Sequence, residues 1–81
     1  MLEYETIQLI KSRNKGWNKY ACIRFVDKCL TRIKAKLPDG IPSNQYFVLP
    51  GFEDVCHNQP IIIFDPTESM YKLTLNNKFN K

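Results

Sequence analysis

The pattern of apolar residues between positions 18 and 38 constrains the fold of this chain more than any other feature. Apolar side chains recur there three and four residues apart, which on a helix gathers them in one stripe about 120° wide. Asn18 is a suitable N-cap, and Pro38 ends the helix because the residue before a proline avoids the helical region. The stripe consists of Cys22, Ile23, Val26, Cys29, Leu30, Ile33 and Leu37. The sequence therefore predicts a helix over residues 18–36 that buries this stripe against another layer.

Residues 2–13 fit either a helix or a strand. Apolar and β-branched residues share one helical face, and the acidic residues lie early and the basic residues late, as suits the helix dipole. The β-branched residues within positions 4–10 would also suit a strand. Lys15 and Gly16 form a helix stop signal. We favour a helix, and the strand remains the alternative.

The pattern changes from helical to strand-like after Gly40. Residues 45–49 are rich in strand-forming side chains and are bounded by two prolines. Residues 61–64 are apolar on both faces, as in a central strand, and residues 70–75 alternate in polarity. We therefore expect an α+β fold in which two N-terminal helices pack on a small antiparallel sheet of about three strands.

The chain length fits a single domain. Of the 81 residues, 43% are hydrophobic and 25% are charged, which is typical of a folded protein. We treat residues 1–81 as one small domain in which the polar tail, residues 76–81, frays. The same element order is compatible with a winged-helix arrangement, in which residues 19–36 would be the recognition helix and residues 61–75 the wing.

The sequence shows no targeting segment. Its first residues are acidic, whereas a signal peptide begins with basic residues. The longest strongly apolar run is residues 61–64, and a membrane-spanning helix needs about 20 apolar residues. Three cysteines, an odd number, agree with a reducing compartment. We expect a cytoplasmic protein with no membrane partner.

Candidate catalytic and metal-binding residues are few. Cys56 and His57 are adjacent, so their side chains point apart and make a poor nucleophile and base. The cysteines lack the CxxC spacing of zinc sites, and the three glycines cannot build a phosphate-binding loop. Glu53, Asp54 and Asp65 would hold magnesium only if the fold brought them together. We expect a protein that is not an enzyme and that binds no metal or cofactor.

Charge is distributed unevenly along the chain. The net charge is +4, but residues 11–36 contain nine basic residues and one acidic residue. Residues 37–71 contain five acidic residues and no Lys or Arg. Such asymmetry indicates a polyanionic partner or an oppositely charged protein surface.

Four of the cations form a row, which we call the basic ridge: Arg24, Lys28, Arg32 and Lys36. They lie four residues apart and, on the predicted helix, opposite the apolar stripe. Like charges at this spacing repel each other by a few tenths of a kcal/mol per pair. Because no acidic residue interrupts the row, the ridge is the strongest candidate for a binding surface.

Neighbouring aromatic and basic residues extend this candidate surface. Phe25 lies at the edge of the ridge, where its ring would stack on a base or a peptide unless it packs on the core. Trp17 precedes the N-cap, and we expect it to pack on the first turn as a hydrophobic staple. The remaining candidates are Lys19, Tyr20, Arg13 and Lys15.

Three interpretations of the ridge stay open. It would bind the phosphate backbone of DNA or RNA with little sequence selectivity. Alternatively, the protein is an interaction module, such as a small inhibitor or adaptor of a nucleic-acid-processing enzyme, that also uses the acidic residues of 53–68. The Lys-, Asn- and Ile-rich composition fits an accessory protein of a phage or another mobile element. In the third interpretation, the ridge is only a solvated helix face.

Overall fold

Two N-terminal helices form where the local signals predicted them. In the computed structural model, which describes the backbone of residues 2–79 and the side chains of residues 2–77, α1 spans Tyr4–Arg13 and α2 spans Lys19–Lys36. Asn18 caps α2, because its Oδ1 accepts a hydrogen bond from the backbone N–H of Ala21 at 2.9 Å. Residues 2–13 could have formed a helix or a strand according to the sequence, and α1 shows that the helix forms.

Three strands follow and build one antiparallel sheet. They are β1 (Phe47–Val48), β2 (Pro60–Asp65) and β3 (Met70–Leu75), in the spatial order β1-β2-β3. In the register of the sheet, Ile62 pairs with Phe47 on one side and with Leu73 on the other. The prediction of a central strand over residues 61–64 is confirmed, and the strand is one residue longer at each end.

The first strand is shorter than the predicted 45–49. The backbone N–H of Gln45 donates to the carbonyl of Pro42 at 2.9 Å, which places Gln45 in a turn. Pro50 has no N–H to donate to a ladder. The two prolines that bound this segment therefore leave only Phe47 and Val48 in register with β2.

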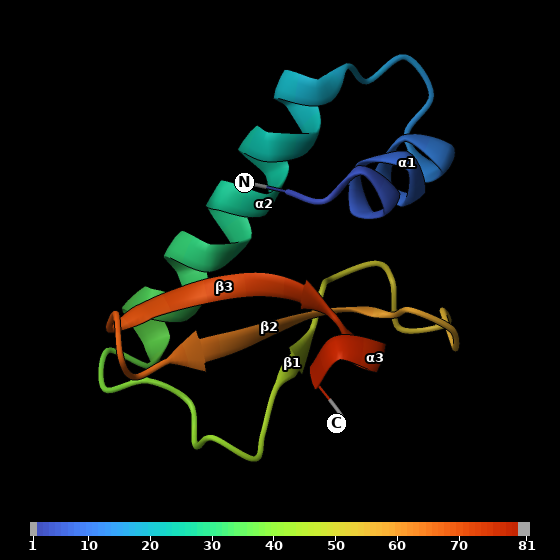
Figure 1. Ribbon diagram of the computed structural model, residues 1–81. Coiled ribbons are helices and arrows are strands. Elements are labelled where there is room, and N and C mark those ends of the chain that lie inside the picture. The colour runs from blue at the N-terminus through green and yellow to red at the C-terminus, as the bar shows by residue number, and fades with distance from the viewer. Residues whose placement is uncertain (1, 80–81) are drawn as a thin grey trace.

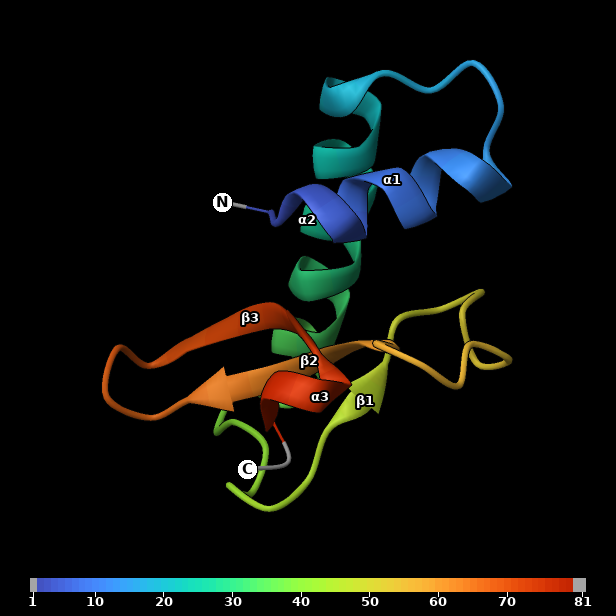
Figure 2. The same ribbon diagram turned by 45° about the vertical axis from the view of Figure 1, so that its right-hand side comes forward.

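Helices α1 and α2 lie on one side of the sheet, and α1 crosses α2 (Figures 1 and 2). The core between the helices and the sheet contains Ile10, Cys22, Leu49 and Ile62, each fully buried. Only the C-terminal half of α2 approaches the sheet, whereas its N-terminal half extends past the sheet beside α1 (Figure 1). The protein is thus a small α+β fold, as predicted.

The polar tail that was predicted to fray, residues 76–81, begins with a short helix. Residues Asn76–Phe79 form a short helix, α3, on the side of the sheet away from α2 (Figure 1). The N–H of Asn76 donates to the carbonyl of Gln59 at 2.8 Å, which ties the start of α3 to the residue before β2. Residues 80 and 81 lie outside the described residues.

Candidate nucleic-acid interface

All four residues of the basic ridge are exposed on α2. Among the described residues, no carboxylate lies within ion-pair distance of any of them; the ion pairs present use Arg13 and Lys72 as the cations. The ridge is therefore a set of cations whose charge no described acidic side chain neutralises.

The opposite face of α2 is buried, as the periodicity predicted. Cys22, Val26 and Cys29 are at most 5% exposed and belong to the core, and Leu30 and Ile33 pack against it. Burial raises the pKa of the Cys29 thiol, which keeps this side chain neutral in the core. Because the core holds this face, the helix cannot rotate about its axis, and the ridge has a fixed direction into solvent.

Asp27 is the only acidic residue of α2, and it does not interrupt the ridge. At 100° per residue, Asp27 and Lys34 share a flank of the helix beside the ridge. The backbone carbonyl of Asp27 accepts a hydrogen bond from the Thr31 hydroxyl at 2.8 Å. One flank of the ridge therefore presents to solvent the carboxylate of Asp27, the ammonium group of Lys34 and the hydroxyl of Thr31, and has no net charge.

Phe25 and Trp17 pack together instead of standing free. Their ring centroids lie 5.7 Å apart with the planes tilted by 60°, and both side chains are half-buried against the core. Trp17 packs inward, and its ring partner Phe25 lies in the second turn of α2, so the staple on the first turn stays a prediction. The packing of Phe25 is the alternative to stacking that the sequence left open, so its ring adds little free surface to the ridge.

Tyr20, Lys19 and Lys15 remain exposed. Tyr20 is 74% exposed although it is a large aromatic residue, and it lies four residues before Arg24 in the row of the ridge. Lys19 begins α2, and Lys15 lies in the connection from α1. The structure thus continues the ridge at its N-terminal end with an aromatic ring.

Arg13 is engaged within the protein. Its guanidinium pairs with the Asp54 carboxylate at 2.8 Å and donates to the Gly51 carbonyl at 2.7 Å. It also lies over the ring of Phe52, 5.1 Å from the ring centroid. The hydrogen bond from Arg13 lowers the pKa of Asp54. Arg13 therefore joins the end of α1 to the loop after β1, a role that the sequence did not reveal because the two partners are far apart in the chain.

The acidic residues of 53–68 are also largely engaged in local structure. Glu53 accepts a hydrogen bond from the N–H of Gly51, and Asp54 pairs with Arg13. Asp65 and Glu68 both pair with Lys72. Glu68 and Lys72 lie four residues apart, across the β2–β3 turn. This spacing was the one feature of the sequence that indicated these ion pairs. These pairs reduce the acidic surface that a protein partner would meet.

The hairpin of β2 and β3 would be the wing of a winged-helix protein. Its tip, residues 66–69, contains Glu68 and no basic residue. A wing that contacts DNA needs cations at this position. The winged-helix arrangement stays a prediction, and the hairpin adds no positive charge to the ridge.

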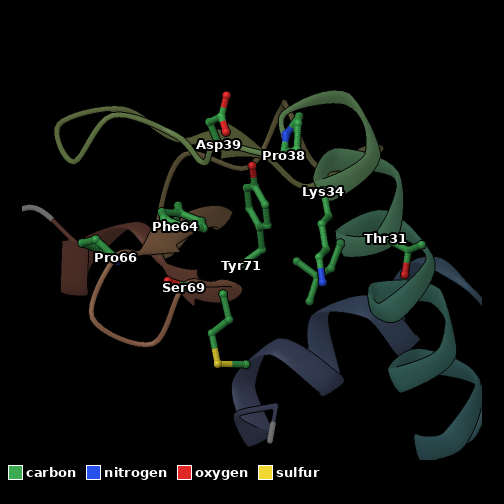
Figure 3. A pocket seen from close by; sticks show the side chains of 10 residues that line it. Thr31, Lys34, Pro38, Asp39, Phe64, Pro66, Ser69 and Tyr71 are labelled. Atoms are coloured by element: carbon green, nitrogen blue, oxygen red, sulfur yellow. The ribbon is translucent and has the colours of Figure 1, made fainter.

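A cavity of about 480 Å³ lies between the C-terminal half of α2 and the β2–β3 turn. Figure 3 shows Tyr71 pointing toward the Pro38–Asp39 turn, where its hydroxyl donates to the carbonyl of Leu37. Lys34 and Asp39 are the charged residues of the lining. Because they carry opposite charges, the cavity favours neither an anionic nor a cationic ligand.

The remaining chemistry-bearing residues are dispersed. All three cysteines are free, with Cys22 and Cys29 in the core and Cys56 exposed. In the part of the chain that the structure describes, no three His, Cys, Asp or Glu side chains gather into a set that would hold a metal ion. Within the same residues, no helix has the length and apolar character needed to cross a membrane.

Comparison with known proteins adds no further constraint on the site. No family model, curated protein or solved structure matches the chain. The fold and the site define a small α+β domain with a row of uncompensated cations on its longest helix.

Proposed function

We propose that this protein is a non-catalytic binding protein that contacts the phosphate backbone of nucleic acid through the basic ridge of α2. The observation that supports the proposal is the row of four exposed cations without a carboxylate partner among the described residues. Between Arg24 and Lys36 the row extends about 18 Å along the helix axis, since each residue adds about 1.5 Å. A polyanion is the ligand that neutralises such a row along its whole length.

The alternative partner, an acidic protein surface, is less well supported. As an inhibitor or adaptor, the protein would use the acidic residues of 53–68 together with the ridge. Asp54, Asp65 and Glu68 are each bound to a cation of the same chain. This internal pairing leaves the ridge as the main charged surface and favours nucleic acid.

The proposal is tested by fluorescence anisotropy with labelled DNA and RNA over a range of salt concentrations. If four phosphates are neutralised, the logarithm of the binding constant falls with the logarithm of the salt concentration with a slope of about −3 to −4. The variant R24Q/K28Q/R32Q should lose this binding. A wild-type protein that binds no nucleic acid at low salt would refute the proposal.

A matched pair of variants separates the ridge from overall charge. K28Q/K36Q removes two ridge lysines, and K11Q/K34Q removes two lysines outside the ridge, so both variants have the same net charge. Binding through the ridge requires a much larger loss of affinity for K28Q/K36Q. Equal losses would show that only net charge matters.

A further inference from the structure

We infer that the nucleic acid bound by the ridge is single-stranded, and that one of its bases stacks on Tyr20. This inference rests on the proposed function and adds the class of nucleic acid to it. It depends on the position of one exposed aromatic ring and on the charges beside the row.

Tyr20 occupies the first turn of α2 with 74% of its surface exposed. Its side chain takes part in no aromatic pair or hydrogen bond among the described residues, whereas Phe25, the other aromatic of α2, is half-buried against Trp17. Tyr20, Arg24, Lys28, Arg32 and Lys36 are each four residues apart, so the ring continues the row. Successive members rise about 6 Å along the axis and turn by about 40°. A single chain of phosphates that follows this row therefore reaches the Tyr20 ring.

Base stacking on an exposed ring requires a base with a free face. In a duplex, each base is covered by its neighbours, whereas in a single strand a base can leave the stack and lie on an aromatic side chain. On the outside of a duplex, Tyr20 would find no uncovered base on which its ring could stack. Its exposure beside the cations thus favours a single strand.

The charges beside the row point the same way. The two strands of a duplex lie about 12 Å apart across the major groove, so contact with both needs cations on two lines of the helix. On the flank that Lys34 occupies, Asp27 faces solvent three residues after Arg24. Because this flank holds one carboxylate and one ammonium group, it has no net positive charge to bind a second phosphate strand, whereas a single strand needs only the ridge.

The inference is tested with labelled single strands of RNA and DNA of about 12 nucleotides and with the matching duplex. We expect wild-type protein to bind the single strands more tightly than the duplex. Y20A should weaken single-strand binding about tenfold, and Y20F should retain most of it, because stacking needs the ring and not the hydroxyl. Y4A is the matched control, since Tyr4 is 76% exposed on α1, outside the row. An oligomer with abasic residues should bind Y20A and wild-type protein equally.

The possible outcomes separate the two proposals. The inference would be overturned if the protein bound duplex as tightly as single strands, or if Y20A and Y4A had equal effects. The proposed function would still hold in that case, provided that binding depended on the ridge. Absence of any nucleic-acid binding by the wild type would refute both. Tighter binding of single strands than of duplex, together with a larger loss for Y20A than for Y4A, supports the inference, and the tighter of the RNA and DNA complexes then identifies the ligand.

Discussion

The guanidinium of Arg13 and the carboxylate of Asp54 lie 2.8 Å apart and join the end of α1 to the loop that follows β1. The contact spans 41 positions of the chain and includes a hydrogen bond of 3.0 Å from Nη2 to Oδ2. Arg13 also contacts the Gly51 carbonyl and the ring of Phe52, which is 2% exposed. Arg13 therefore has a structural role, whereas no described carboxylate pairs with a cation of the ridge.

Substitution of Arg13 should destabilise the protein more than substitution of Asp54. R13A loses the ion pair, the hydrogen bond to Gly51 and the contact with Phe52, whereas D54A loses the ion pair alone. Urea unfolding of both variants and of R13A/D54A measures the difference. If D54A proved equally or more destabilising than R13A, the contacts with Gly51 and Phe52 would contribute nothing.

Acid should weaken the fold between about pH 4 and pH 2. The hydrogen bond from Lys72 lowers the pKa of Asp65 to about 2, below the value of about 3.9 for an unfolded chain. Such a carboxyl stabilises the fold above about pH 4, and this contribution is lost as the pH falls through the folded pKa. We expect the urea midpoint to fall over this range in the wild type and to fall less steeply in D65N and in K72Q. If the urea midpoint fell equally steeply with decreasing pH in all three proteins, the stabilising role of the Asp65–Lys72 pair would be contradicted.

Gly40→Ala should destabilise the protein more than Gly16→Ala. Both glycines have positive φ, +95° and +87°, which strains any residue with a Cβ by about 1–2 kcal/mol. At Gly40 the added Cβ would also lie 2.6 Å from Cδ2 of Phe64, whereas at Gly16 it meets no atom within 4 Å. We expect G40A to lower the free energy of unfolding by about 1 kcal/mol more than G16A does. Calorimetric or urea unfolding of both variants checks the order.

K28E should make the protein more stable and a weaker binder. Lys28 lies between Arg24 and Arg32, and a glutamate there replaces two repulsions at i, i+4 with two attractions, for a gain of about 1–2 kcal/mol. The same change places an anion in the middle of the proposed phosphate contact. Urea unfolding and anisotropy on the same preparation measure both effects. If K28E were less stable than the wild type, the positive charges of the ridge would already be neutralised by other groups.

Ile62→Ala should lower the free energy of unfolding by about 2–5 kcal/mol, since Ile62 is fully buried in the central strand. Ile63→Ala is the control, because Ile63 points to the opposite face of β2 and is only half-buried. A larger loss for I63A than for I62A would contradict the placement of the core between the helices and this face.

The location of α2 and the directions of its two faces were predictable because their causes are local. The 3.6-residue period, the Asn18 cap and Pro38 all act within a few residues of the backbone that they shape. The central strand was predictable for a similar reason, since a run that is apolar on both faces must lie between other layers.

The partners of individual side chains were not predictable from these patterns. Phe25 lies at the edge of the ridge on a helical wheel, and only the path of the chain before α2 brings Trp17 onto its ring. Arg13 belonged to the same basic segment as the ridge, but the return of the loop after β1 places Asp54 against it. Tyr20 was a candidate in the sequence because it lies off the apolar stripe, but its exposure depends on the absence of any described element that packs over it.

The amino-acid sequence by itself determined the long helix, its apolar and basic faces, and the α+β class, because periodicity and chain-stopping residues act over short distances. Only the tertiary structure decided which charges are neutralised and which rings are covered. Those contacts join segments up to 41 residues apart, and they depend on how the loops close around the core.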